Sequence, residues 1–156
     1  NLKCEDVVAI GRAPYTNWIG RMQKADTEIV MRSLASVGME AYAERTMDKM
    51  SDGECQRIMI ARALAQDTPI ILLDEPTSAL DPVMTGEVLD VIRELAEAGQ
   101  SIILATHEIS FARKVADWVV FLAAGKVQES SSASDFFTKP KTELAQQYLE
   151  GLSKYR

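Results

Sequence analysis

Long apolar runs, spaced cysteine pairs and an excess of basic residues are all missing from this sequence. No apolar run approaches the roughly 18 residues of a membrane-spanning helix, and the opening NLKCEDVVAIGR is not a signal peptide. The two cysteines, Cys4 and Cys55, form no metal-binding or redox spacing, which fits a reducing cytosol. The net charge of -6 argues against a general nucleic-acid or anionic-membrane binder.

The composition that remains is that of a folded domain. The chain has 156 residues, of which 47% are hydrophobic, and this is enough for one domain with a real core. The sequence contains no internal repeat. Because it begins at Asn1 rather than at a methionine, we expect a processed, trimmed or partial chain.

Helical patterns dominate the first third, and short apolar strands alternate with helices after it. This alternation predicts an α/β fold with a parallel sheet, preceded by a helical subdomain whose boundary lies near Met50. The run 70–73 predicts a strand buried on both faces. The expected helices are 2–12, 25–37 (capped by Asp26 or Thr27 and ended by Gly38), 40–50, 53–66, 82–98 (capped by Asp81), 109–117, 134–138 and 141–152. The expected strands are 70–73, 102–105, 118–122 and 126–128, with a loop at 13–21, a turn at 123–125 and a loop or cap at 130–134.

Two adjacent carboxylates, Asp74 and Glu75, follow the apolar strand 70–73 directly. In open α/β sheets, ligands bind at the carboxyl ends of the strands. A carboxylate pair there suits Mg²⁺ binding by one member and activation of a nucleophilic water by the other. The alternative, that both are solvated loop residues before Pro76, would be preferred for an isolated pair.

The stretch MSDGE, residues 50–54, precedes the strongest helical pattern. Ser51 and Glu54 have the spacing of a capping box, which satisfies the free amides of a helix start. A helix N-terminus also attracts anions, and Gly53 leaves room for a phosphate to approach. A capping box alone is common, so it does not by itself predict phosphate binding.

Residues 50–81 resemble the core of an ATP-binding-cassette (ABC) ATPase, and the resemblance extends over nearly the whole chain. MSDGE (50–54) stands where that family has its LSGGQ-type signature, and IILLDE (70–75) is similar to its Walker B strand. SALD (78–81) is similar to its D-loop, and THE (106–108) to its switch histidine. The order and separation of the motifs make the resemblance specific.

The resemblance implies a role for each matching residue. Asp74 would support Mg²⁺, and Glu75 would be the general base for the attacking water. His107, the only histidine, would reach the γ-phosphate; alone it would pass for an ordinary loop histidine. The chemistry implied is phosphoryl transfer from ATP to water.

The resemblance also implies a nucleotide contact in a second subunit. The signature Ser51-Asp52-Gly53-Glu54 would face ATP held by a second ATPase subunit in a head-to-tail dimer, with Ser51 and Gly53 contacting its γ-phosphate. Asp81 would lie at the subunit interface. Asp52 replaces the usual first glycine of the signature and Glu54 its glutamine, so Asp52 places a negative charge near a phosphate site.

No G-x-x-x-x-G-K-[ST] phosphate loop occurs in the sequence. In the family this loop lies N-terminal to the matching region, so the resemblance implies a partial P-loop NTPase core with a helical signature subdomain. The expected division is 1–66 for the helical subdomain, 67–129 for the second half of the ATPase core and 130–156 for a helical tail. We expect exposed apolar strand edges and weak binding of Mg-ATP by the chain alone.

The resemblance further implies that transmembrane permease subunits are partners and that they hold the protein at the cytoplasmic side of the inner membrane. No nucleic-acid partner is expected. Tyr15 and Trp18 are candidate permease contacts, or else pack within the helical subdomain. The stretches 4–21 and 51–77 resemble iron-siderophore or haem importers, whereas the stretch from Leu80 onward resembles polar amino-acid importers. This mixture leaves the substrate open and also fits a recombined sequence. A non-catalytic interaction fragment and an ABC ATPase of DNA maintenance or translation stay as alternatives.

Overall fold

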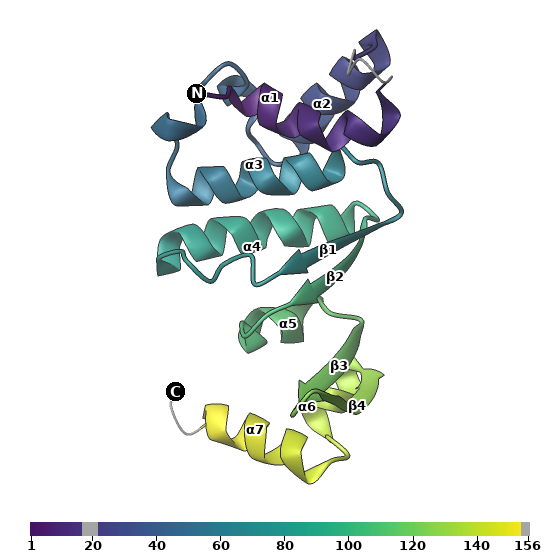
Figure 1. Ribbon diagram of the computed structural model, residues 1–156. Coiled ribbons are helices and arrows are strands. Elements are labelled where there is room, and N and C mark those ends of the chain that lie inside the picture. Colours follow the sequence, from purple (N-terminus) through teal and green to yellow (C-terminus); the bar gives the residue numbers. More distant parts are fainter. Residues whose placement is uncertain (17–21, 154–156) are drawn as a thin grey trace. The chain divides into compact units, whose positions relative to one another are not determined.

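The computed structural model describes residues 1–16 and 22–153 and divides into two compact units, Asn1–Thr106 and His107–Arg156 (Figure 1). The predicted domain boundaries at 66/67 and 129/130 were placed by the sequence motifs and differ from the boundary between these two units. They stay a prediction. Trp18 lies outside the described residues. Within the described part of the chain, no helix is long and apolar enough to cross a membrane.

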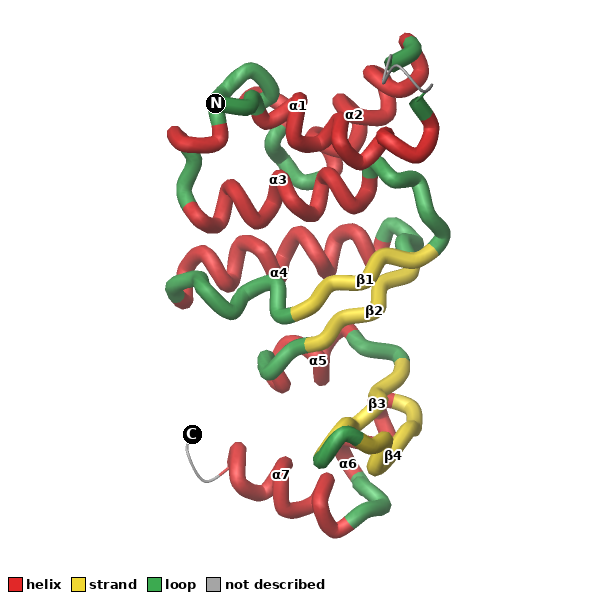
Figure 2. The backbone as a smooth tube through the Cα atoms, viewed as in Figure 1, coloured by secondary structure: helices red, strands yellow, loops and turns green. Residues whose placement is uncertain are grey.

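The first unit consists of helices followed by a short parallel sheet (Figure 2). Its elements are α1 (Cys4–Ala9), the 3-10 helix η1 (Ile10–Tyr15), α2 (Lys24–Ser36), the 3-10 helices η2 (Glu40–Tyr42) and η3 (Met47–Lys49), α3 (Asp52–Leu64), β1 (Ile70–Asp74), α4 (Pro82–Glu97) and β2 (Ser101–Ala105).

The described part of the second unit, residues 107–153, combines a hairpin with three helices. Its elements are α5 (Ile109–Val115), β3 (Trp118–Ala123), β4 (Lys126–Ser132), α6 (Ala133–Thr138) and α7 (Glu143–Ser153).

The first helical segments differ from the prediction. The expected helix 2–12 is an α-helix only to Ala9, and η1 continues the chain to Tyr15 with Pro14 inside it, where a loop was expected. Pro14 lacks an amide hydrogen, which favours this short, tighter turn over further α-helix. The expected helix 40–50 is also wrong, since this stretch forms only the two 3-10 turns η2 and η3.

Asp26 does not cap α2 as an N-cap residue, contrary to the prediction. The helix starts one turn earlier, after Gln23, and the Asp26 carboxylate accepts the Gln23 amide at 2.9 Å. The other carboxylate oxygen pairs with Nε of Arg12 at 3.0 Å, and both side chains are buried. The Gln23 amide and then Arg12 hold the pKa of Asp26 below its usual range. The predicted end is confirmed by Gly38 at φ +68°.

Arg12 connects three elements of the first unit. Besides its ion pair with Asp26, its Nη1 donates to the carbonyl of Ala65 at 3.0 Å, just beyond the last turn of α3. A cation there compensates the negative end of the helix dipole. Next to Arg12, Gly11 approaches α3 so closely that an added Cβ would lie 2.3 Å from the Arg62 carbonyl oxygen. The contact between η1 and α3 therefore requires a glycine.

The sheet of the first unit is parallel, as predicted, but β1 is not buried on both faces. Strands β1 and β2 pair in register, with Leu72 opposite Ile103. Ile71 and Leu73 are buried, whereas Leu72 is 68% and Ile103 56% exposed. These exposed apolar residues lie on a face of the sheet, so the expectation of exposed apolar strand edges stays a prediction. A continuous apolar run suits burial on both faces, but among the described residues only one face is covered.

The second unit contains an antiparallel hairpin whose turn lies at the predicted position, 123–125. β3 pairs with β4 through a turn in which Ala124 and Gly125 both have positive φ. β4 is longer than predicted and continues to Ser132, so the stretch 130–134 is not a loop. The alternative of a cap is confirmed at Ser132, whose hydroxyl accepts the amide of Asp135 at 3.1 Å at the start of α6. The apolar pattern alone does not report the direction of a short strand.

Glu129 connects this hairpin to the C-terminal helix α7. Its carboxylate is buried and accepts the amides of Lys141 and Thr142 at 2.9 and 3.0 Å, together with the hydroxyl of Thr142 at 3.2 Å. Burial raises the pKa of Glu129, but these hydrogen bonds outweigh it and leave the pKa below its usual value. The start of α7 therefore depends on an ionised Glu129.

Replacing Gly11 by alanine tests the contact between η1 and α3. The new methyl group would overlap a backbone carbonyl, so we expect Gly11→Ala to lower the free energy of unfolding by about 1–3 kcal/mol. Gly86→Ala on α4 is the matched control, because nothing lies within 4 Å of its new Cβ, and it should stabilise by about 0.5–1 kcal/mol. Urea unfolding measures both. Equal effects of the two substitutions would contradict the close approach.

The Glu129 contacts predict a pH dependence of α7. Because the folded pKa is below the unfolded one, the stabilisation is present above the unfolded pKa of about 4.3 and is lost as pH falls through the folded pKa. We expect the amide signals of α7 to shift on acidification below that value. Glu129→Gln should weaken the helix at neutral pH and remove this acid transition, whereas the exposed Glu143→Gln should keep it.

Candidate functional site

The start of α3 carries the capping box that the sequence predicts. The Ser51 hydroxyl accepts the Glu54 amide at 3.3 Å, and the Glu54 carboxylate accepts the Ser51 amide at 2.8 Å and its hydroxyl at 3.0 Å. The bond from the Ser51 amide is the main reason that the pKa of Glu54 lies below its usual value, and the charges of Arg57 and Arg45 add to it. Glu54 is therefore an ionised cap.

Gly53 is buried, and its close neighbour in the structure is another helix. A Cβ added to Gly53 would lie 3.1 Å from Cβ of Met84, in the first turn of α4. Asp52, by contrast, is exposed. The absence of a side chain at Gly53 thus allows α3 and α4 to pack together, while a contact from Gly53 to phosphate stays a prediction.

Asp74 and Glu75 lie where β1 ends, as expected from the apolar run before them. Asp74 is the last residue of β1 and is exposed. Glu75 has a φ of +43°, in the left-handed region that side chains other than glycine rarely adopt. Its amide donates to the carbonyl of Ala105, the last residue of β2, at 2.9 Å. Such a conformation costs about 1–3 kcal/mol, and strained residues of this kind concentrate at functional sites.

Asp81 forms the N-cap of α4, as predicted. Its carboxylate accepts the amides of Val83 at 2.8 Å and Met84 at 3.1 Å. Since Met84 packs against Gly53, the capped first turns of α3 and α4 lie next to each other. In the preceding loop, the buried hydroxyl of Thr77 has no hydrogen-bond partner among the described residues.

His107 begins the second unit, whereas Asp74 and Glu75 belong to the first. Its side chain is 60% exposed, and Nε2 lies 3.8 Å from a carboxylate oxygen of Glu108. The structure describes His107 within its own unit, so its predicted contact with a γ-phosphate stays a prediction.

Mg²⁺ is compatible with Asp74 as a ligand but would need further oxygens. Among residues 1–16 and 22–153, no group of three or more His, Cys, Asp or Glu side chains is arranged to hold a metal ion. Mg²⁺ is commonly bound by one or two carboxylates together with substrate phosphates and water. One exposed carboxylate at a strand end therefore fits a metal that arrives with a nucleotide.

Sequence reasoning did not identify Arg57, and it placed Met84 on the apolar face of its helix without identifying Gly53 as its neighbour. Arg57 of α3 pairs with Glu87 of α4, with 3.4 Å between Nη2 and Oε2. Its position one turn after Gly53 was a possible signal, but a charged residue on a helix gives no hint of its partner.

Tyr15 packs within the helical part, where its hydroxyl donates to the Gln66 carbonyl at 2.8 Å, although half of the residue is exposed.

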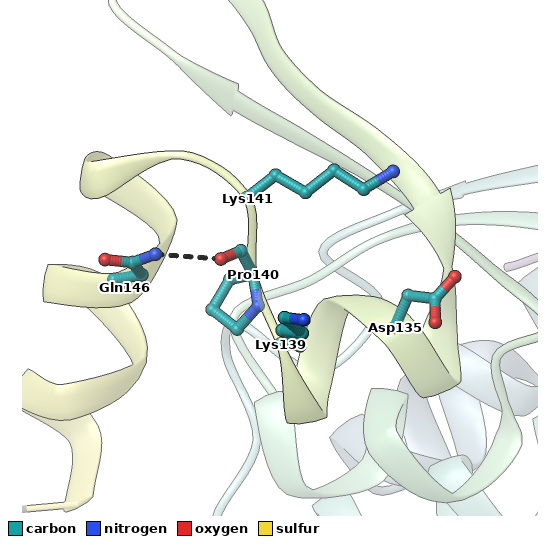
Figure 3. A pocket seen from close by; sticks show the side chains of 5 residues that line it. All are labelled: Asp135, Lys139, Pro140, Lys141 and Gln146. Carbon is teal, nitrogen blue, oxygen red and sulfur yellow. Dashed lines mark hydrogen bonds between the residues drawn. The ribbon is translucent and has the colours of Figure 1, made fainter.

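A shallow pocket of about 500 Å³ lies in the second unit, where α6 is followed by α7 (Figure 3). Gln146 points to the carbonyl of Pro140 and donates to it at 2.9 Å. Lys139, Lys141 and Asp135 are exposed, and none of the lining residues belongs to the predicted site. The pocket therefore does not mark the site.

Similar sequences are ATP-binding subunits of amino-acid transporters. The glutamate transport ATP-binding protein GluA of Corynebacterium efficiens is 45% identical over 132 residues, which cover 84% of this chain and 54% of GluA. The glutamate/aspartate import ATP-binding protein GltL of Escherichia coli is 47% identical over 122 residues, 78% of this chain and 51% of GltL. The chain thus spans about half the length of the curated relatives it matches.

Solved structures agree with the predicted fold class. An inward-facing metal-chelate type ABC transporter matches with a TM-score of 0.82 and 26% identity, over 96% of this chain and 58% of the other. A dimeric post-hydrolysis ATP-binding cassette bound to ADP and Pi matches with a TM-score of 0.65 and 28% identity, over 85% of this chain and 57% of the other. The α/β ABC ATPase fold is therefore confirmed.

The family assignment follows from these matches together with the motifs. The sequence profile described as ABC transporter matches residues 5–78, which include the signature stretch and the acidic pair at the end of β1. The chain belongs to the ATPase domains of the ABC transporter family.

Proposed function

We propose that this chain is the signature and Walker B part of the ATP-hydrolysing subunit of a bacterial importer for a polar amino acid. One observation carries the proposal: Asp74 and a strained Glu75 lie at the carboxyl end of a parallel strand, in a chain 45% identical to an amino-acid transport ATPase. Identity to the metal-chelate type transporter is lower, at 26%, which favours the amino-acid class.

Each proposed residue contributes to positioning or charge. Glu75 would orient and deprotonate the attacking water, and its fixed backbone limits where the carboxylate can lie. Asp74 would hold Mg²⁺, which, when bound, neutralises charge on the phosphates. His107 would donate to the γ-phosphate. Because phosphoryl transfer to water needs little covalent chemistry from the protein, such positioning accounts for most of the catalysis.

The proposed site is completed by partners. The first turn of α3, from Ser51 to Glu54, would face ATP bound to a second ATPase subunit, with Asp81 at the interface between the two. Transmembrane permease subunits would couple hydrolysis to import and hold the ATPase at the cytoplasmic side of the inner membrane. The dimeric cassette among the similar structures supports the arrangement of two ATPase subunits.

Calorimetry with Mg-ATP tests the nucleotide site. The sequence contains no phosphate loop, so we expect no binding by the chain alone at micromolar ATP. A mixture of this chain with the part of GltL that the sequence match does not cover should bind and hydrolyse ATP. Glu75→Gln in this mixture should keep binding and lower hydrolysis by about 10²–10⁴-fold. Micromolar binding by the chain alone, or full hydrolysis by Glu75→Gln, would contradict the assignment.

Two substitutions of Asp81 separate its capping role from the proposed interface role. Asp81→Ala should lower the free energy of unfolding by about 1 kcal/mol because two amides lose their acceptor. Asp81→Asn keeps the cap but removes the charge, so its stability should stay close to that of the unchanged chain. Both should weaken ATP-dependent dimerisation of the mixture, measured by light scattering. Normal dimerisation of Asp81→Asn would argue against a charged interface contact.

A further inference from the structure

The first turns of α3 and α4 form a matched pair of helix starts. Gly53 of α3 lies against Met84 of α4, and one turn further along Arg57 lies against Glu87. These successive contacts show that the two helices run in the same direction with their N-termini together, as Figure 1 also shows. The two first turns therefore lie against each other through these contacts.

Arg57 pairs with a carboxylate of α4 and acts electrostatically on a carboxylate of its own helix. Its Nη2 is 3.4 Å from Oε2 of Glu87 on α4. Its positive charge also helps to lower the pKa of Glu54, whose carboxylate accepts the Ser51 amide in the capping box. A planar guanidinium with several donors can serve two acceptors in different directions, which a lysine ammonium does less well. Arg57 thus connects the capped turn of α3 with the adjoining face of α4.

Stability alone does not account for this arrangement. The pair with Glu87 is partly exposed, with 21% of the Arg57 side chain and 53% of the Glu87 side chain accessible, and such pairs contribute little to folding. The Nε atom of Arg57 is buried without a hydrogen-bond partner among the described residues, which opposes folding. Any role of Arg57 therefore lies in the local geometry of the two first turns rather than in the global stability of the chain.

We propose that Arg57 is a positioning residue that, through Glu87, holds the first turn of α3 in register with the first turn of α4. Ser51 and Gly53 would then keep a constant place relative to Asp81 when these residues face a nucleotide. The inference rests on the proposed function for the identity of that ligand. The register itself is a property of this chain and is measurable without nucleotide.

Amide hydrogen exchange on the whole chain, followed by NMR, measures this register. The informative amides are those bonded to the two capping residues: Glu54 and Cys55 in α3, Met84 and Thr85 in α4. Arg57→Met should accelerate their exchange about fivefold or more, because their turns lose a shared anchor. The amides of Ala65 and Ala98, at the far ends of the same helices, should change less than twofold.

Matched variants give the controls. Arg93→Met removes an arginine that pairs with Asp90 within α4, at 2.9 Å, and should leave all these amides unchanged. Glu87→Gln removes the negative charge that Arg57 faces on α4, at an exposed position, and should reproduce the effect of Arg57→Met, so the result does not depend on how well the arginine variant folds. Equal acceleration at both ends of the helices, or no change in either variant, would overturn the proposal.

Kinetics of the mixture with the unmatched part of GltL give a second readout. Arg57→Met should lower kcat about tenfold while KM for ATP changes less than twofold, since misplacement affects the transition state more than ground-state binding. Arg57→Lys should recover part of kcat. A rise in KM with unchanged kcat would overturn a positioning role. If the unchanged mixture hydrolyses no ATP, the proposed function fails, while the exchange result still decides the role of Arg57.

Discussion

The first unit depends on close packing at two faces of α3. At one face, Gly11 brings η1 against the Arg62 carbonyl, and at the other, Gly53 of α3 lies against Met84 of α4. A Cβ at Gly11 would overlap a backbone carbonyl, and one at Gly53 would press against Met84, because packed protein interiors have almost no free volume. The position of the capped turn at Ser51, and with it the proposed nucleotide-facing surface, follows from these two contacts.

Charged groups then hold the ends of the helices that packing has placed together. Asp26 anchors the start of α2 and pairs with Arg12, whose other contact is the carbonyl of Ala65 at the end of α3. Glu54 and Asp81 cap the starts of α3 and α4. In each case a carboxylate lies at a positive helix end or a cation at a negative one, as helix dipoles favour. The second unit repeats the principle with Glu129 at the start of α7.

The proposed catalytic residues lie at the edge of a sheet that, among the described residues, is covered on only one face. Asp74 and Glu75 end a two-stranded sheet with one exposed apolar face, and Glu75 is held in a left-handed conformation by its contact with Ala105. Parallel sheets are normally covered on both faces. The apolar character of Leu72 and Ile103 is therefore in keeping with a larger assembly, such as the complete cassette of the relatives.

The sequence by itself determined the family, the motifs, the parallel direction of β1 and β2, and the caps at Ser51 and Asp81, because each depends on local spacing or short-range hydrogen bonds. It did not determine that 40–50 lacks an α-helix, that one face of β1 is exposed or that β4 extends to Ser132. Only the tertiary structure decided that Gly53 meets Met84 and Arg57 meets Glu87. These contacts join residues about thirty positions apart, and helical periodicity shows which face of a helix is apolar but not which neighbour covers it.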